Sequence, residues 1–389
     1  MVVIFEFLGT EPVENVITCM HYKVDKVVYF GYHEVIQSLK NSTDKFLKKY
    51  CGVSNTVYHP MPKDDLQSVL KSMRKEIEYE LGQKNSIYFD ITGGESLILV
   101  AFGMLSTEYK TPMHHFDVRK NKLMELEEGA GRSISKEVPV KKIGFTLDSF
   151  IELRGGIINY NLRKDMKDIE SVEAAADVER LWSVAKRYQD YWNPLSEFLR
   201  RNFNSEEGLM IRVPAGQMLQ ILSESKTKLN TPAKFNELLD ALEKAGVLND
   251  VIHSKKEYQF RFKNSFVKDC LWDGGSILEL YVYRCEKKTT GDCRVGVHID
   301  WDGEIKYPWG ADVLNEIDVL TLQGNIPTFI SCKSGKMEGA KALPALYELE
   351  TVARRFGGKY ARKVLAVTRP LGEAYQARAD EMGIEVRVE

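Results

Sequence analysis

The chain has few of the features that indicate a zinc site, a disulfide framework or a membrane segment. Its six cysteines are scattered without a CxxC pair, and its seven histidines show no HxH or HExxH spacing. We therefore expect a reducing compartment, the cytoplasm, without structural disulfides or zinc. The longest apolar run, 97–105, is too short to span a bilayer, and no basic leader precedes the first apolar residues, so we expect no membrane contact.

Two common nucleotide-binding motifs are missing as well. No GxGxxG follows the first apolar run, and the chain has no GxxxxGK[ST], so neither a dinucleotide cofactor nor a P-loop nucleotide is expected. The net charge of −2 does not indicate a nucleic-acid partner. Locally, however, residues 333–369 contain nine Lys or Arg and three Glu. This segment is either a solvated basic helix face or a basic surface beside a catalytic site.

The first 120 residues alternate short β-rich runs with amphipathic helical stretches, which predicts a parallel, doubly wound sheet. The expected strands are 2–9, 26–32, 55–61, 86–92 and 112–118, and the expected helices are 14–23, 34–50, 64–81 and 95–109. Ligands of such sheets bind at the carboxyl ends of the strands. Two loops lie there, LGTEPVEN (8–15) and DITGGES (90–96). In the second, Gly93 and Gly94 would let a ligand phosphate approach the backbone, although a simple tight turn is the alternative.

The middle of the chain is mostly helical. Two helical stretches, 215–225 and 231–248, precede a pair of alternating runs, 249–254 and 257–263, an order that resembles a winged-helix unit. In the second helix the acids outnumber Lys234 and Lys244, whereas a DNA-reading helix is normally basic. We therefore favour a structural spacer over a DNA-binding module.

After residue 269 the pattern changes to a self-contained mixture of helix and strand. Helices are expected over 274–284 and 339–358, and strands over 293–300, 304–310, 315–322, 326–333, 363–370 and 384–389. Side chains alternate along a strand, so Glu316 and Asp318 should share one face of their strand, and Ser331 and Lys333 one face of the next. If these strands are neighbours, both pairs can meet at one end of the sheet. Glu279, on the preceding helix, could add a carboxylate.

Such a group of acids beside a lysine suits metal-assisted phosphodiester hydrolysis. Carboxylate oxygens are ligands of Mg²⁺ or Mn²⁺, and a lysine can orient water or offset charge in the transition state. Each of these residues alone could be structural, but acid, acid and x-Lys in this strand order favour a nuclease.

The motifs in the tail resemble a known family. Asp318 followed by Ser331-Cys332-Lys333 resembles the PD-(D/E)XK nuclease motif, and NEIDVL, FISCKSG and ALYELETVARRFGG together resemble the nuclease domain of CARF-containing CRISPR effectors. The two N-terminal loops are similar to the ligand loops of the CARF domain, a Rossmann-like module. The resemblance covers about 1–145 and 269–389.

One position departs from the motif, because Ser331 stands where full members carry a carboxylate. A serine hydroxyl can hold a metal-bound water but supplies no charge, so we expect an acid elsewhere to replace it. Glu279 is the first candidate, Glu316 the second and Glu350 the third.

The resemblance implies an α/β protein with three parts: a CARF domain (1–145), a helical, winged-helix-like segment (146–268) and a PD-(D/E)XK, restriction-endonuclease-like domain (269–389). It implies a homodimeric endonuclease of type III CRISPR antiviral defence, activated by a cyclic oligoadenylate, most plausibly cyclic tetra-adenylate, and cutting DNA, RNA or both, with single strands favoured. The expected cofactor is Mn²⁺ or Mg²⁺.

The site residues predicted on this basis fall into three sets. The catalytic set is Asp318, Lys333, Glu279, Glu316 and Ser331. The metal set is Asp318, Glu279 and Cys332. The ligand-binding set is Leu8, Gly9, Thr10, Glu11, Pro12, Asn15, Thr92, Gly93 and Gly94.

Two other functions compete with this one. A ligand-responsive CARF transcription regulator would bind DNA through the winged-helix-like middle, but it leaves Asp318 and Lys333 without a role. A CARF-linked ribonuclease of the HEPN type needs an R-x4-H motif, and no histidine has an arginine five positions before it.

Overall fold

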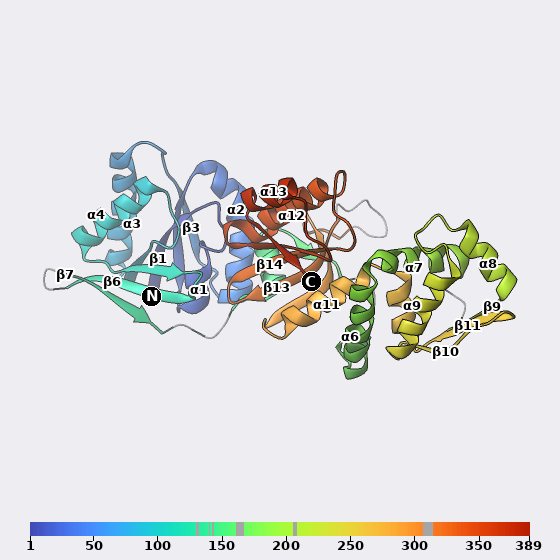
Figure 1. The fold of residues 1–389 in the computed structure, drawn as a ribbon. Helices are drawn as coiled ribbons and strands as arrows, with labels where there is room; N and C mark the ends of the chain where they lie inside the picture. The colour runs from blue at the N-terminus through green and yellow to red at the C-terminus, as the bar shows by residue number, and fades with distance from the viewer. Residues whose placement is uncertain (130–131, 140, 142–143, 161–166, 205–207, 306–313) are drawn as a thin grey trace.

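The computed structural model describes residues 1–129, 132–139, 141, 144–160, 167–204, 208–305 and 314–389. They form three units in a row (Figure 1). An N-terminal α/β unit lies at one end, a mainly helical middle unit at the other, and a C-terminal α/β unit between them. The last third of the sequence is therefore the spatial centre of the molecule. No described helix combines the length and apolar character needed to cross a membrane.

The N-terminal unit is built on a seven-stranded sheet in the order β3-β2-β1-β4-β5-β6-β7. Its strands are β1 (Val2–Leu8), β2 (Lys26–Gly31), β3 (Thr56–Pro60), β4 (Ser86–Asp90), β5 (Met113–Asp117), β6 (Lys122–Gly129) and β7 (Arg132–Val138). Its helices are α1 (Ile17–His21), α2 (His33–Phe46), the π-helical turn η1 (Leu47–Cys51), α3 (Leu66–Gly82) and α4 (Ser96–Tyr109). The first five strands are parallel, as the sequence predicts, whereas the antiparallel β6–β7 hairpin was not predicted.

Both faces of this sheet are covered, which explains why its strands are apolar throughout. Along β1, Val3, Phe5 and Phe7 pack with α3 and α4, while Ile4 and Leu8 belong to a second apolar cluster on the other face. The doubly wound arrangement predicted for this part is therefore confirmed.

The C-terminal unit is built on a six-stranded sheet in the order β16-β15-β14-β13-β12-β8. The strands are β8 (Ile157–Ile158), β12 (Asp292–Asp300), β13 (Leu314–Gln323), β14 (Ile326–Lys333), β15 (Arg362–Val367) and β16 (Ile384–Val388). The helices are α5 (Leu147–Leu153), α11 (Ser276–Lys287), α12 (Ala342–Gly357), the 3-10 turn η4 (Gly358–Tyr360) and α13 (Glu373–Glu381). Strands β12, β13 and β14 are antiparallel neighbours, and β14, β15 and β16 are parallel.

Three details differ from the sequence expectations. Strand β8 and helix α5 pack with this unit although they lie within the predicted middle segment, 146–268. The domain boundaries at 145 and 268 therefore remain predictions. The expected strand 304–310 is not found at Glu304 and Ile305, and its remainder lies outside the described residues. Helix α13 was not predicted, because Ala379 is its one buried residue and the apolar signal is therefore weak.

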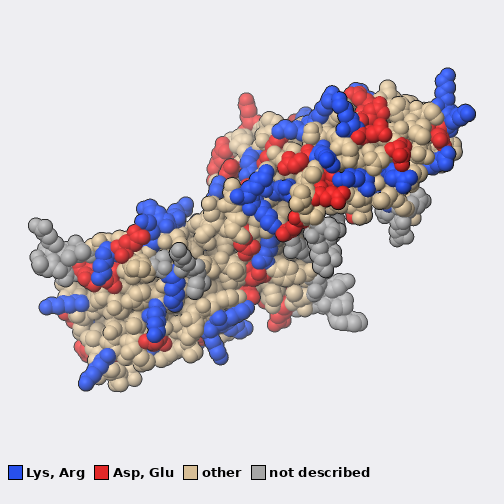
Figure 2. Space-filling view, turned by 90° about the horizontal axis from the view of Figure 1, so that it is seen from below, with Lys and Arg blue, Asp and Glu red and all other residues tan. Residues whose placement is uncertain are grey.

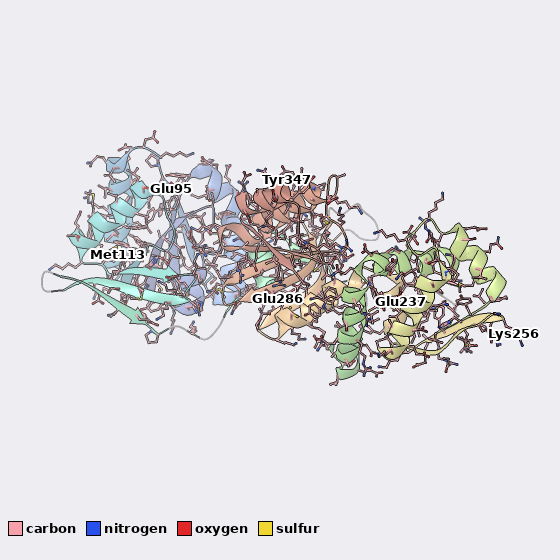
Figure 3. The ribbon with its side chains drawn as sticks, viewed as in Figure 1. Glu95, Met113, Glu237, Lys256, Glu286 and Tyr347 are labelled. Atoms are coloured by element: carbon pink, nitrogen blue, oxygen red, sulfur yellow. The ribbon has the colours of Figure 1, made fainter. Side chains whose placement is uncertain are left out.

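The C-terminal sheet shares its two faces with the two flanking units. Helix α12 covers one face, in an apolar cluster that also contains Leu8 and Phe46 of the N-terminal unit. Helix α11 covers the other face, in a cluster continuous with the middle unit. Figure 3 shows this layering, with Tyr347 of α12 on one side of the sheet and Glu286 of α11 on the other. A displacement on either side can therefore reach the same sheet.

The middle unit consists of helices around a three-stranded antiparallel sheet in the order β10-β11-β9. Its elements are η3 (Lys167–Glu170), α6 (Val172–Arg187), α7 (Gln189–Asn202), β9 (Met210–Pro214), α8 (Ala215–Glu224), α9 (Pro232–Lys244), β10 (Leu248–His253), β11 (Glu257–Phe262) and α10 (Ser265–Trp272). Two helices followed by a hairpin match the predicted winged-helix-like order. Figure 2 shows acidic and basic side chains intermixed over this end of the molecule, and Lys234 of α9 is paired with Glu237 at 2.9 Å.

Candidate active site and ligand loops

The first candidate site lies where the pairing of β13 with β14 ends. The register runs from Gln323 opposite Ile326 to Val319 opposite Ile330. Beyond it, Asp318 turns its carboxylate toward β14. Its Oδ2 accepts hydrogen bonds from the backbone N–H of Cys332 at 2.5 Å, from Ser331 Oγ at 3.2 Å and from Lys333 Nζ at 3.4 Å. The two strands are therefore neighbours, as the sequence analysis required, and three of its catalytic candidates are in direct contact.

At this point the side chains of β13 stop alternating regularly between the two faces of the sheet. Val295 and Val319 pack into the cluster under α11, whereas Val297 and Ile317 pack into the cluster under α12. Gly296, opposite this position on β12, has a φ of 59°, a conformation that glycine adopts without strain. Alternation alone therefore does not place Glu316 and Asp318 on one face, although both carboxylates lie near enough to Glu279 to raise its pKa.

Glu279 lies in the same electrostatic environment. It stands in the first turn of α11 and is half-buried. Burial is the largest cause that raises its pKa to about 8, followed by the negative charges of Asp318, Asp273 and Glu316, while Lys333 lowers it. The first candidate for the displaced acid is thus close enough to Asp318 for the two charges to repel each other.

The two lower-ranked candidates differ in their surroundings. Glu316 is more than half exposed and lies 4.0 Å from His298 Nε2, within electrostatic reach of Glu279. Glu350 of α12 is bonded instead to Lys363 Nζ, and Lys363 pairs with Phe329 on β14, four residues before Lys333. The structure does not bring Glu350 to Asp318, so it is the wrong candidate for the missing acid.

Asp273 is a neighbour that the sequence analysis missed. Its Oδ2 accepts a hydrogen bond from Ser276 Oγ at 2.6 Å, and its Oδ1 accepts one from the N–H of Gly275 at 3.3 Å. Asp273 therefore holds the turn that leads into α11, the helix that carries Glu279.

The residues present fit a hard divalent cation in part. Among the residues that the structure describes, no group of three or more His, Cys, Asp and Glu could hold a metal ion. Mg²⁺ however commonly uses one or two carboxylates, with water and substrate phosphate completing its shell. Asp318 and Glu279 supply two. Burial, followed by the charges of neighbouring acids, raises the pKa of Glu279, and a cation would offset those negative charges.

The third predicted metal ligand, Cys332, does not fit through its thiol. Its side chain is buried in the cluster under α11, and burial, followed by Asp318 and Glu279, raises its pKa well above the ordinary value. The thiolate is the form that binds metals, and sulfur is a poor ligand for Mg²⁺. We therefore remove the Cys332 side chain from the metal set.

The second candidate site comprises the two loops at the carboxyl ends of β1 and β4. The first loop is closed by Asn15, whose Oδ1 accepts from the N–H of Gly9 at 2.9 Å and whose Nδ2 donates to the carbonyl of Gly9 at 2.8 Å. Leu8 is fully buried in the core and Asn15 nearly so. These two predicted ligand residues therefore support the loop, and Thr10 is the exposed residue at its tip.

The second loop packs directly against the first. The hydroxyl of Thr92 accepts from the N–H of Phe116 at 2.8 Å, and its own N–H donates to Asp90 at 2.7 Å. A Cβ on Gly93 would lie 2.9 Å from Glu14 Oε2, and Gly94 has a φ of 148°. Both glycines are thus required by the chain itself, so the tight turn weighed in the sequence analysis is present, and their contact with a ligand stays a prediction.

Both acids of the first loop bind the C-terminal unit, a connection that no sequence pattern indicated. Glu14 Oε1 accepts from Tyr360 Oη at 2.5 Å and is 2.6 Å from Lys359 Nζ. Glu11 Oε2 accepts from the backbone N–H of Lys359 at 3.0 Å, and Glu11 is ion-paired with Arg154. The loop predicted to hold the ligand is therefore tied to the turn that follows α12.

Comparisons with solved structures support this fold over almost the whole chain. The protein VC1899 from Vibrio cholerae has a TM-score of 0.71 at 18% identity, covering 100% of this chain and 94% of that one. Can2 from Sulfobacillus thermosulfidooxidans, in complex with cyclic tetra-adenylate, has a TM-score of 0.64 at 15% identity, covering 99% of this chain and 92% of that one. No protein-family model and no curated protein matches the sequence. At these identities the likeness shows the fold, and it includes all three units.

Proposed function

We propose that the chain is a metal-dependent endonuclease of type III CRISPR antiviral defence, activated by a cyclic oligoadenylate, with cyclic tetra-adenylate as the proposed activator. The observation that carries this proposal is the convergence of Ser331, Lys333 and the Cys332 amide on Asp318, beside a Glu279 whose pKa is raised. The fold shared with Can2, a protein solved with cyclic tetra-adenylate, supports the choice of activator.

In this proposal Asp318 and Glu279 hold a Mg²⁺ or Mn²⁺ ion. The bound ion supplies Lewis acidity toward the scissile phosphate and lowers the pKa of a bound water. Lys333 faces Asp318 from the end of β14, and its ammonium group can stabilise negative charge that develops on the phosphate. Phosphodiester hydrolysis on either DNA or RNA fits these groups, with single strands as the favoured substrate.

The serine in the motif then has a positioning role. Ser331 Oγ donates to the same carboxylate oxygen that accepts the Cys332 N–H. Two donors from β14 therefore fix Asp318 while Lys333 supplies the positive charge. The carboxylate expected at position 331 is replaced by Glu279, which reaches the site from α11 instead of from β14.

The arrangement of units gives the activator a route to the site. The ligand loops contact the turn after α12, and α12 packs on the sheet that carries Asp318 and Lys333. A ligand that binds one arrangement of these units more tightly shifts the population toward it. We further propose a homodimer in the cytoplasm, in which two copies of the loops enclose the ring.

A transcription regulator is the less supported alternative. The middle unit has a winged-helix-like order, but α9 carries the Lys234–Glu237 pair, and Asp240 accepts from His253 at 2.8 Å. Acids on that helix oppose the approach of a phosphate backbone. A regulator also leaves the cluster around Asp318 without a function.

The direct test incubates the purified chain with labelled single-stranded DNA and, separately, RNA, with and without cyclic tetra-adenylate and Mn²⁺. We expect cleavage of at least one substrate when both additions are present, and little when either is omitted. Tight, sequence-specific DNA binding without cleavage would instead support the regulator.

A further inference from the structure

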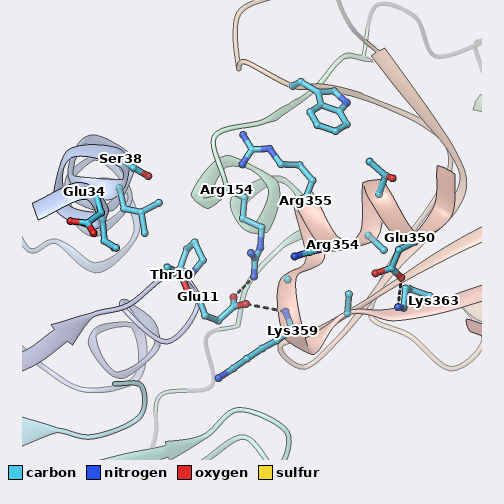
Figure 4. A pocket seen from close by; sticks show the side chains of 18 residues that line it. Thr10, Glu11, Glu34, Ser38, Arg154, Glu350, Arg354, Arg355, Lys359 and Lys363 are labelled. Carbon is cyan, nitrogen blue, oxygen red and sulfur yellow. Dashed lines mark hydrogen bonds and ion pairs between the residues drawn. The ribbon is translucent and has the colours of Figure 1, made fainter. Parts of the chain in front are cut away.

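A pocket of about 1000 Å³ lies between the N-terminal and C-terminal units. Figure 4 shows Glu34 and Ser38 of α2 on one side, Arg354 and Arg355 of α12 on the other, and Glu11 reaching between them. This volume is in the range of small-molecule sites. The pocket is separate from the Asp318 site, because Lys363, which lines it, pairs with Phe329 and not with the Lys333 end of β14.

The pocket has an excess of positive charge. Its cationic lining residues are Arg154, Arg354, Arg355, Lys359 and Lys363, and its acidic ones are Glu11, Glu34 and Glu350. Each acid already has a partner: Glu11 pairs with Arg154, Glu350 with Lys363, and Glu34 with Lys63, which lies outside the lining. Lys359 is paired with Glu14.

Two arginines are left over. Arg354 and Arg355 are exposed residues in the last turn of α12, and neither forms an ion pair with any residue in the described part of the chain. Burial lowers the pKa of Arg154, Glu11 raises it, and Arg355 lies close enough to lower it further. The lining therefore contains Arg354 and Arg355 in addition to the paired Arg154, and their positive charge favours a further anion.

Two residues of the pocket carry buried donor atoms. Among the described residues, Arg154 Nε and Trp301 Nε1 find no hydrogen-bond acceptor, and Arg154 is only 8% exposed. A buried donor without an acceptor is unfavourable, so a ligand that supplied acceptor oxygens here would be stabilised. Both residues line the pocket, and the Trp301 indole is an aromatic surface on which a base can stack.

Glu11 occupies the place that suits a phosphate. Its carboxylate accepts hydrogen bonds from the guanidinium of Arg154 and from the backbone N–H of Lys359, the second at 3.0 Å. A guanidinium fork combined with a backbone N–H is a common arrangement for binding phosphate oxygens. A phosphodiester group, whose two non-bridging oxygens share the negative charge and accept hydrogen bonds, could satisfy these donors and the neighbouring Arg354 and Arg355 together.

We propose that this pocket is a phosphate-binding subsite for the activating nucleotide, in which Arg154, Arg354 and Arg355 take a phosphodiester group that displaces the carboxylate of Glu11. The identity of the ligand rests on the function proposed above. Because α12 carries Arg354 and Arg355 and packs against β14, phosphate binding here would act on the element that ends in Lys333. The subsite thereby joins the sensor loop and the catalytic sheet through the ligand itself.

The test is isothermal titration calorimetry of the full chain with cyclic tetra-adenylate, with AMP and with a single-stranded oligonucleotide as separate titrants. The double variant Arg354→Gln/Arg355→Gln should bind cyclic tetra-adenylate about 10-fold or more weakly, the loss expected for charge-assisted hydrogen bonds. The matched control is Arg200→Gln/Arg201→Gln, an arginine pair in the last turn of α7, which should change affinity less than about twofold.

A variant that should bind the ring more tightly tests whether a phosphate displaces the Glu11 carboxylate. Glu11→Gln removes the competing charge but keeps the side-chain shape, so cyclic tetra-adenylate should bind several-fold more tightly. Equal or weaker binding by Glu11→Gln would overturn the displacement. A thermal melt of each variant confirms that it is folded.

Failure of the subsite and failure of the proposed function can be told apart. If the wild type binds cyclic tetra-adenylate and the α12 double variant binds it equally well, the subsite is wrong while the function stands. If the wild type does not bind cyclic tetra-adenylate, the proposed activator is wrong, and the AMP titration then tests the subsite. AMP binding that depends on Arg354 and Arg355 supports the subsite. Absence of such binding overturns it. Dependence seen only with the oligonucleotide would make the pocket a substrate contact and overturn the inference.

Discussion

Glu279→Gln should increase the stability of the metal-free protein by an amount that grows with pH. The carboxyl has an ordinary pKa of 4.5, and in the folded protein burial and the neighbouring acids raise it to about 8. Below 4.5 the group is protonated in both states and has no effect. Between the two values the unfolded chain loses the proton while the folded protein keeps it, so rising pH favours unfolding.

The magnitude follows from the same two values. They differ by about 3.5, and each pKa unit corresponds to about 1.4 kcal/mol, so the destabilisation reaches at most about 5 kcal/mol above pH 9. At pH 7 it is about 3 kcal/mol before solvent screening of the half-buried side chain, and about 2 kcal/mol after it. Glutamine has no charge to desolvate, so the variant escapes this cost.

The assay is the melting temperature of wild type and Glu279→Gln in EDTA from pH 4.5 to 9. A gap of a few degrees should open as pH rises and level off above pH 8. Glu348→Gln, which removes an exposed acid of α12, should show no such slope. Addition of Mn²⁺ at pH 8 should raise the wild-type melting temperature more than that of the variant. A pH-independent gap, or a gap that narrows with rising pH, would refute the placement of Glu279 beside Asp318.

The remaining predictions concern activity. Chelation by EDTA should abolish cleavage, measured as loss of labelled substrate; full turnover in EDTA would exclude the metal mechanism. Asp318→Asn and Lys333→Ala should each reduce the cleavage rate by about 10²-fold or more while binding of cyclic tetra-adenylate, followed by calorimetry, survives. Loss of ligand affinity in both would point to misfolding. Gly93→Val should raise the activator concentration needed for half-maximal cleavage by about 10-fold, because its side chain would collide with Glu14; an unchanged dose response would leave DITGGES as a turn only.

Local patterns were enough to predict the elements that carry the candidate site. Alternation and apolar runs located β13 and β14, and the acid within an apolar helix located Glu279, because each signal depends on neighbours in the sequence. Alternation along β13 is interrupted at Asp318, opposite Gly296 of β12, and no pattern in the sequence marked this irregularity. The prediction that Cys332 binds the metal failed because its side chain is buried in the packed sheet, and the motif alone does not reveal that burial.

The contacts between units could not be predicted from the sequence. Glu11 and Glu14 are separated from Lys359 and Tyr360 by more than 340 residues, and no periodicity links them. The same holds for Arg154, whose burial depends on the docking of two units. These pairings require the three-dimensional arrangement, whereas the shared α/β fold class required only the alternation of strands and helices.

The measurement that tests the central claim most directly is the single-turnover cleavage rate of labelled single-stranded DNA and RNA by wild type, Asp318→Asn and Lys333→Ala, each with and without cyclic tetra-adenylate in Mn²⁺. The proposal predicts activator-dependent cleavage by wild type and almost none by either variant. Cleavage that is equal in all three proteins, or that is independent of the activator, would contradict it.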